Sequence, residues 1–259
     1  MRTPRLKLLI LITLFSLFSV KSYGQSKEEA VKIVTKTYNR VLVQANKDGP
    51  RVAIDEQEAK ASAAGREVSH CGQDSQPSSA RGHAKTSIKK LNELGLEVNL
   101  RSTADVRGGH YLTCQESDPK TFPCDRGGCL GATRNDKTAY ANVSSSAKLE
   151  FRFPTTDSPD YLIKISKSGS RDLVATLRDP EGKEIKLNQP DGKDPVLRRI
   201  SGGSYSLNLD LPAVASEKGQ DKEDLDKSAT VRVELIAAPV AKGNEASNYP
   251  HVGALMMGR

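Results

Sequence analysis

The sequence predicts a mainly β protein with an antiparallel β-sandwich at its C-terminus. Two observations predict this class. Apolar residues alternate with polar ones in five runs after residue 148, the pattern of strands that have one buried and one solvated face. Turn sequences rich in Gly, Pro, Asp and Ser separate these runs. An N-terminal helix and a disulfide-held irregular region are expected to precede the sandwich.

Residues 1–24 have the three parts of a secretory signal peptide. Met1–Lys7 is basic, Leu8–Val20 is a 13-residue apolar run, and small residues precede a cleavage point after Gly24. A transmembrane span needs ~20 apolar residues, and Lys21 ends this run too early. We therefore expect cleavage after Gly24 and a secreted or periplasmic protein without a transmembrane anchor.

The leader also dominates the net charge. The chain has 39 Lys+Arg against 32 Asp+Glu, a net charge of +7. Four of the cations and none of the acids lie in residues 1–24, so the remainder has 35 against 32, a net charge of +3. A near-neutral protein is not typical of nucleic-acid binding, and we expect no nucleic-acid partner.

Residues 25–68 are predicted to be a helical segment. Ser26 and Glu29 match a capping box. The following apolar residues recur at three- and four-residue steps, as on one helix face: Ala30, Val31, Val34, Tyr38, Val41, Leu42 and Ala45. Gly49-Pro50 ends this helix, and residues 51–68 continue with a weaker helical pattern. The helix could pack on its own domain or serve in docking and oligomerisation.

Residues 69–143 are predicted to be a linker followed by a cysteine-containing region of irregular or α/β structure. The stretch from His70 to His83 is rich in Ser, Gln, Gly and Pro. Thr86–Leu94 has the spacing of a short helix, and Leu96–Leu100 alternates like a strand. Residues 101–139 have almost no periodicity, which indicates a loop region held by disulfides.

The four cysteines are Cys71, Cys114, Cys124 and Cys129. An even number in an exported protein favours two disulfides, with three possible connectivities. The intervening Asp-Arg-Gly-Gly turn could join Cys124 to Cys129 and leave Cys71 for Cys114, but Cys114 could equally pair with either of those two. No Cys-x-x-Cys pair is present, so a zinc site is disfavoured.

Residues 144–238 are predicted to be the β-sandwich domain, and residues 239–259 a flexible tail. The alternating apolar sets are Leu149/Phe151/Phe153, Tyr161/Ile163/Ile165, Leu173/Ala175/Leu177, Tyr205/Leu207/Leu209/Leu211 and Val231/Val233/Leu235. Lys183–Leu187 and Val196–Ile200 are shorter candidate strands. Short strands at this spacing favour a two-sheet sandwich. The charged residues 215–228 are expected to be a mobile hairpin.

Part of this domain resembles the bacterial pre-peptidase C-terminal domain. The sequence Asp172–Gly182 has a strand followed by an Asp-Pro-x-Gly turn, and Gly203-Ser204-Tyr205 matches a Gly-x-Tyr strand entry of that family. The resemblance covers residues 145–238 and implies a jelly-roll-like sandwich. The family usually accompanies a protease domain, which this sequence lacks.

Catalytic motifs are absent from the sequence. There is no Gly-x-Ser-x-Gly, His-Glu-x-x-His, phosphate-binding or dinucleotide-binding motif. His110 and Cys114 could form a nucleophile pair, but a bridged cysteine is expected in an oxidising compartment. Four acids near strand ends could bind Ca²⁺ but are expected to be solvated turn residues: Asp157, Asp160, Asp172 and Asp179. We expect no catalytic, cofactor or metal site.

These observations favour an exported, non-enzymatic binding or accessory protein that acts through its β-sandwich. The partner is a protein or a cell-surface glycan. Past residue 24 there are three Phe, six Tyr and no Trp, which disfavours sugar stacking and favours a protein. The alternatives are a secreted hydrolase using the Cys/His region 70–129 and a structural or oligomeric envelope protein. The sequence does not encode the oligomeric state. Titration of free thiols in the unfolded, unreduced protein separates the hydrolase, which needs a thiol, from the other two.

Overall fold

The structure, a computed structural model, describes residues 31–69, 75–114, 132–154, 161–185, 187, 196–200 and 202–237. These residues form 13 β-strands and no helix, which confirms the mainly β class. All strand pairs are antiparallel and belong to two sheets, consistent with a β-sandwich. In the described part of the chain, no helix is long and apolar enough to cross a membrane.

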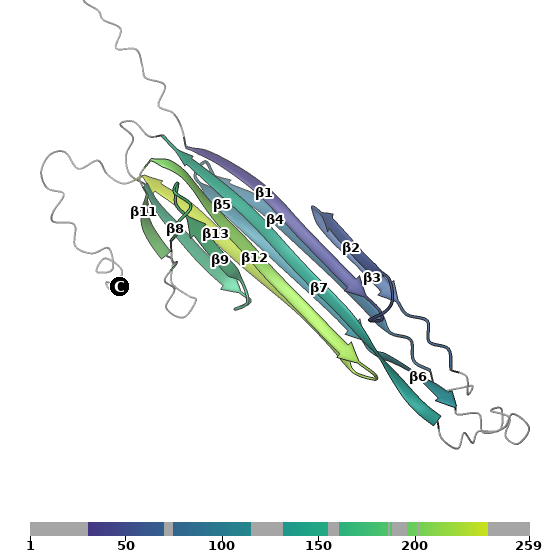
Figure 1. The fold of residues 1–259 in the computed structure, drawn as a ribbon. Coiled ribbons are helices and arrows are strands. Elements are labelled where there is room, and N and C mark those ends of the chain that lie inside the picture. The colour runs from purple at the N-terminus through teal and green to yellow at the C-terminus, as the bar shows by residue number, and fades with distance from the viewer. Residues whose placement is uncertain are drawn as a thin grey trace, which may run out of the picture. The chain divides into compact units, whose positions relative to one another are not determined.

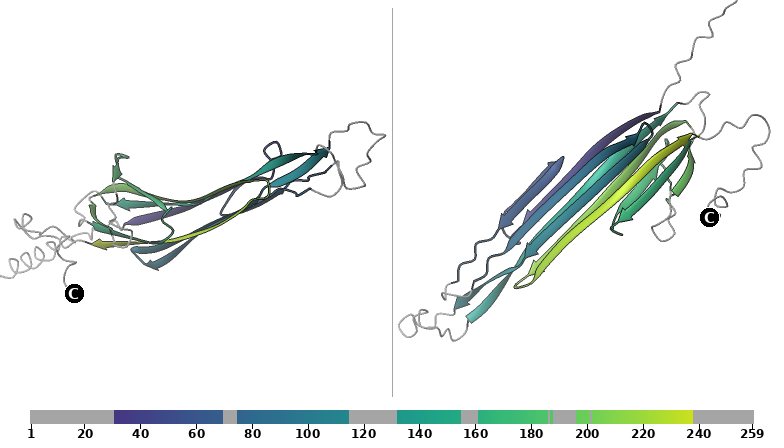
Figure 2. Two further views of the ribbon diagram at one scale, coloured as in Figure 1. Left: turned by 90° about the horizontal axis from the view of Figure 1, so that it is seen from below. Right: turned by 180° about the vertical axis from the view of Figure 1, so that it is seen from behind.

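The two sheets, which we call sheet A and sheet B, are visible as separate layers in Figure 2. Sheet A has the order β10-β9-β12-β7-β1-β2, with β6 paired to β7. Its strands are β1 (Lys32–Gln44), β2 (Arg51–Glu56), β6 (Gly109–Cys114), β7 (Ala132–Phe153), β9 (Val174–Arg178), β10 (Glu184–Ile185) and β12 (Gly203–Lys218). Sheet B has the order β11-β8-β13-β5-β4-β3. Its strands are β3 (Glu58–Ala64), β4 (Ser79–Asn92), β5 (Gly95–Arg107), β8 (Tyr161–Gly169), β11 (Val196–Ile200) and β13 (Lys222–Ala237).

Six long strands, β1, β4, β5, β7, β12 and β13, run side by side and carry a core with two parts (Figure 1). The large-residue core is built mostly from Leu, Ile, Val and Phe side chains, including the fully buried Leu149, Phe151 and Ile163. The small-residue core consists of Ala and Val, including Val41, Val43 and Ala84. Small side chains let the sheets approach closely where the second core lies.

A buried polar layer separates the two cores and links the sheets. The Thr86 hydroxyl of sheet B donates to Oδ1 of Asn39 in sheet A at 2.6 Å. The Ser102 hydroxyl of sheet B donates to the Leu211 carbonyl of sheet A at 2.6 Å. Ser145 accepts from the backbone N–H of Lys85 at 3.2 Å. Because buried polar groups need partners, these contacts fix how the sheets align along the strands.

The strands predicted in the C-terminal part are confirmed. The alternating residues of β7, β8, β12 and β13 point into the core, and β11 spans the predicted Val196–Ile200. The Asp179–Gly182 turn is also confirmed: the Gly182 N–H donates to the Asp179 carbonyl at 3.0 Å, and Gly182 has a φ of 81°. Glycine adopts this left-handed conformation without a steric penalty.

The predicted N-terminal helix is wrong within the described residues. Lys32–Gln44 forms β1, and the weaker helical pattern of residues 51–68 falls on β2 and β3. Six residues of β1 are β-branched, including Ile33 and Val41, and this composition favours a strand over a helix. The spacing of its apolar residues fits a helix face as well as it fits alternate positions of a strand, and pairing with β7 and β2 decides between them.

Two further local predictions are wrong. The short helix expected at Thr86–Leu94 is the second half of β4 and its turn, because β4 pairs with β5 in a hairpin closed at Glu93-Leu94. The mobile hairpin expected at residues 215–228 is the ordered end of β12 and the start of β13, which pairs with β5. Leu225 lies on the inner side of this strand, and its neighbours Asp224 and Asp226 are exposed on the other side.

The first half of the chain contributes to the same two sheets as the predicted sandwich. β5 starts with the predicted strand Leu96–Leu100 and continues through residues 101–107, in the region expected to be irregular, and it pairs with β13 from residue 95 to residue 107. β1, in the segment expected to be helical, pairs with β7 along its whole length. The leader 1–24 and the tail 239–259 lie outside the described residues.

Candidate binding site on the open flank

One flank of the two sheets is stepped. β2 pairs with residues 39–44 of β1, and β3 pairs with residues 79–85 of β4. The single residue Gln57 joins β2 in sheet A to β3 in sheet B. Residues 32–38 of β1 and 86–92 of β4 therefore have no described strand on this side (Figure 1). We call these two segments the open edges.

An open edge presents hydrogen-bonding groups. In an antiparallel ladder, the N–H and C=O groups of every second residue point to one neighbour, and those between them point to the other. In residues 32–38 one set serves the ladder with β7, where Lys32 pairs with Arg152 and Tyr38 with Ser146. The other set has no backbone partner among the described residues. Such a row is a template for another strand.

The two open edges differ in regularity. The β4–β5 ladder has a register shift between Lys90 and Asn92, so the β4 edge is bulged, and it also carries Lys89 and Lys90. Residues 32–38 of β1 keep an uninterrupted register with β7 and include Ile, Val, two Thr and Tyr, all good strand formers. Bulges and lysines are the devices by which proteins protect edges, so the β4 edge is the better protected of the two.

A groove of ≈ 560 Å³ lies between the open edges. Half of its lining residues carry a short hydroxyl side chain, and the others are one isoleucine, one glutamine and an acid and a lysine: Thr35, Thr37, Gln57, Glu58, Lys85, Thr86, Ser87 and Ile88. Three large apolar side chains are exposed on the same edges, namely Val34 (37%), Tyr38 (53%) and Leu91 (39%). The open flank thus combines unpaired backbone, exposed apolar groups and a groove that small side chains can enter.

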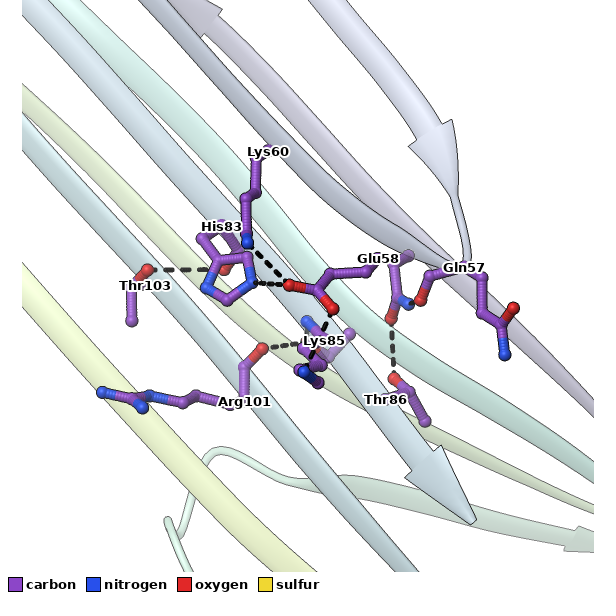
Figure 3. Close-up of polar contacts among 10 residues, drawn as sticks. Gln57, Glu58, Lys60, His83, Lys85, Thr86, Arg101 and Thr103 are labelled. Carbon is purple, nitrogen blue, oxygen red and sulfur yellow. Dashed lines mark hydrogen bonds and ion pairs between the residues drawn. The ribbon is translucent and has the colours of Figure 1, made fainter.

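A cluster of charged residues on β3 and β4 borders this groove (Figure 3). The Lys60 Nζ lies 2.8 Å and the His83 Nε2 3.1 Å from Oε1 of Glu58, and the Lys85 Nζ lies 3.0 Å from Oε2. Hydrogen bonds from Lys60, Lys85 and His83 lower the pKa of Glu58 to about 2. A carboxylate held ionised in this way is a poor proton acceptor near neutral pH, so the cluster is suited to holding β3 on β4.

Glu58→Gln is expected to remove a pH-dependent contribution to stability. The pKa of Glu58 is about 2 in the folded protein and 4.5 as a free group, so folding favours the ionised form. Its contribution is complete above pH 4.5 and is lost as the pH falls towards 2. Thermal midpoints of both proteins from pH 2 to 7 should differ most above pH 4.5 and converge at the acid end.

The control for this comparison is Glu181→Gln, which removes an exposed carboxylate from the turn between β9 and β10. It should change the midpoint at pH 7 by less than Glu58→Gln does. A difference between wild type and Glu58→Gln that stays constant down to pH 2 would contradict the role given to the cluster.

The sequence-predicted site residues do not come together. His110 and Cys114 lie four residues apart on the single strand β6, so their Cα atoms are about 13 Å apart, too far for a nucleophile–base hydrogen bond. Asp172 pairs with Lys227 at 2.8 Å, and Asp179 accepts from the Lys183 N–H at 2.7 Å. Within the described ranges, no three His, Cys, Asp or Glu residues gather where they could hold a metal ion.

Several predicted residues lie outside the described part of the chain: His70, Cys71, Cys124, Cys129, Asp157 and Asp160. Of the four cysteines, the structure describes the backbone of Cys114, the last residue of β6. The two predicted disulfides therefore stay predictions.

Sequence reasoning missed the open edges. The sequence did contain one indication of a strand, because five of the seven residues 32–38 are β-branched or aromatic. That signal indicates a strand, but it does not indicate that the strand lacks a neighbour.

Comparisons with known proteins leave the family open. No protein-family model and no curated protein matches the chain. A solved structure, the GH31 alpha-xylosidase of Xanthomonas citri, matches with 10% identity and a TM-score of 0.18, over 74% of this chain and 30% of that one. This chain thus spans less than a third of that protein, and a likeness so low carries no argument about fold or activity. The resemblance to the pre-peptidase C-terminal domain stays a prediction.

Proposed function

We propose that this chain is an exported, non-enzymatic binding protein that takes up an extended segment of a protein partner as an additional strand on β1. The open edge at residues 32–38 carries the proposal, since no described strand pairs with it on one side and its register with β7 is regular. In strand addition, backbone hydrogen bonds supply affinity, and the alternating side chains of the added strand supply specificity.

Three other edges without a described partner strand, those of β12, β13 and β4, carry protective features that the β1 edge lacks. On the opposite flank, β9 covers β12 only up to Asp210, and the remainder of β12 contains Pro212, which has no N–H to donate. β8 covers β13 only from Ala229 on, and the uncovered residues 222–228 include five charged side chains. A proline, a run of charged residues and a bulge thus protect the edges of β12, β13 and β4. The β1 edge has neither a proline nor a bulge, and its lysines are its only protective feature.

A polypeptide fits this flank better than a glycan. Binding of sugars on a sheet relies on exposed aromatic faces, and Tyr38 is the one aromatic side chain among the large exposed apolar residues of the described chain. The groove itself is lined by three threonines, Ser87, Ile88 and the longer polar side chains Gln57, Glu58 and Lys85, without any aromatic residue. Such a lining accepts the small alternate side chains of an added strand.

Export and a non-enzymatic role are part of the proposal. The pattern of residues 1–24 supports export, and an oxidising compartment would convert the four cysteines to two disulfides. The separation of His110 from Cys114 along β6 removes one candidate catalytic pair, which supports binding over hydrolysis.

Selection of heptapeptides from a random displayed library on the mature protein tests the proposed function. Selected peptides should slow amide hydrogen exchange in residues 32–38, where about half of the amides face the open edge. The amides of residues 39–44, already covered by β2, serve as the internal control and should change little. If no peptide is enriched, or if protection appears only elsewhere, strand addition on β1 is ruled out.

A further inference from the structure

We infer that the segment bound by β1 is acidic, with Glu or Asp at alternate positions and small or β-branched residues between them. This inference rests on the proposed function and adds the chemistry of the partner. It follows from the charges on the outer side of the open edge, the lining of the groove on its inner side, and the residues that limit its length.

The outer side of the open edge is positively charged. Lys32 and Lys36 are exposed, and neither forms an ion pair with a described residue. Their register partners on β7 are Arg152 and Lys148, so four cations lie in two adjacent rows.

The only acid between these rows is already neutralised. Glu150 lies 2.8 Å from the Lys148 Nζ and 3.4 Å from Arg152 Nη2, and Lys148 together with Arg152 lowers its pKa. Four cations against one anion leave an excess of three positive charges beside the open edge. Cross-strand pairs of opposite charge stabilise a sheet and like charges oppose it, so a strand added here gains from acids on its outer face.

The inner side selects for small residues. Side chains of an added strand that point inward would enter the groove against Thr35, Thr37 and Ile88. Threonine, valine and serine fit a groove lined by hydroxyls and one isoleucine, whereas an inward carboxylate would lie near the ion-paired Glu58 at its end. The two sides together require alternation of acidic and small residues.

β2 sets the length and the end of the segment. β2 stops at Glu56, which pairs with Asn39, so an added strand can extend along residues 32–38 before it meets the end of β2. That is seven residues, or about 23 Å. At this junction the charge of Asp55 is balanced by Arg40, whose Nε lies 3.6 Å from its Oδ1. The cations left for an added strand are therefore Lys32 and Lys36, and the acidic positions should face these two and not Tyr38.

Two labelled peptides test the inference by fluorescence anisotropy on the full mature protein. They are Thr-Glu-Val-Glu-Val-Glu-Thr, whose glutamates face Lys32, Val34 and Lys36 when the peptide pairs with residues 31–37, and the same peptide with Lys in place of Glu. We expect the acidic peptide to bind at least about tenfold more tightly, and this ratio should shrink as salt rises and screens the exposed charges. The double variant Lys32→Glu/Lys36→Glu should reverse the preference.

The matched control is Lys47→Glu/Lys222→Glu, which makes the same change of charge at two exposed lysines, one in the turn after β1 and one at the start of β13, and should keep the preference. A scrambled peptide, Thr-Glu-Glu-Val-Val-Glu-Thr, has the same charge without alternation and should bind more weakly than the alternating one. If the scrambled and the alternating acidic peptide bind equally well, the inference is overturned, because net charge alone would then explain the preference.

Other outcomes separate this inference from the proposed function. If library peptides protect residues 32–38 but are neutral or basic, strand addition stands and the acidic preference is overturned. If no peptide protects these residues, both are overturned. If residues 32–38 are already protected in the peptide-free protein and lose protection on dilution, a second copy of this chain occupies the edge, which also overturns the inference.

Discussion

Phe151→Ala is expected to lower the free energy of unfolding by about 4 kcal/mol, the usual range for removing a fully buried phenylalanine. Phe151 is 0% exposed and lies in β7, with Tyr205 of β12 on one side and Ile33 of β1 on the other. The phenyl ring is surrounded by the large-residue core, so its removal leaves an enclosed apolar cavity. Denaturation with guanidinium chloride measures the change.

The same variant tests whether the first and second halves of the chain share one core. The large-residue core contains Leu96, Val98 and Leu100 of β5 as well as residues of β8, β12 and β13. Hydrogen exchange should therefore accelerate in β5 and β13 together. Val214→Ala, on an outer position that is 49% exposed, is the control and should change stability by less than about 0.5 kcal/mol. Loss of protection in β13 with β5 unaffected would mean that the halves fold separately.

Gly82→Ala should destabilise the protein by about 2 kcal/mol, although alanine is the smallest possible addition. Gly82 lies in β4 between Ala61 of β3 and Ala104 of β5. A Cβ at this position would be 2.5 Å from Cγ1 of Val41 and 2.8 Å from Cγ2 of Val143, both in the opposite sheet. At such distances the sheets must separate or the valines must move.

A compensating substitution checks the cause of that loss. Val41→Ala removes the nearer methyl group, so Gly82→Ala/Val41→Ala should be more stable than the sum of the two single changes predicts. Equilibrium denaturation of all four proteins gives the coupling energy. A coupling energy of zero would show that Gly82 is needed for its backbone and not for the space it leaves.

Much of the fold could be predicted from the sequence in the C-terminal part. Alternation at Leu149, Phe151 and Phe153 indicates a strand because one face of the sheet is buried and the other is solvated. Consecutive residues therefore have to be apolar and polar in turn, and this pattern can be recognised within a short segment. The Asp179–Gly182 turn is equally local, since it depends on a proline and on a glycine able to adopt positive φ.

The N-terminal part could not be predicted in the same way. In β1, Val34, Tyr38 and Val41 have helical spacing, while Val41 and Val43 alternate. Both readings fit, and the ladder with β7 decides for the strand. In the small-residue core, alanines such as Ala80 and Ala84 are buried at alternate positions, but alanine has no strong preference for strands and gives little warning of a sheet.

The sequence by itself determined the mainly β class, the strand positions after residue 148 and the Asp179–Gly182 turn, because these depend on neighbours within a few residues. The tertiary structure alone decided that the first strands enter the same two sheets, that Asn39, Thr86, Ser102 and Ser145 form a buried layer, and that β2 leaves half of β1 uncovered. The open edge is a property of pairing between residues far apart in the chain. A strand looks the same in sequence whether or not its second neighbour is present, since the hydrogen-bonding groups that the neighbour would satisfy belong to the backbone.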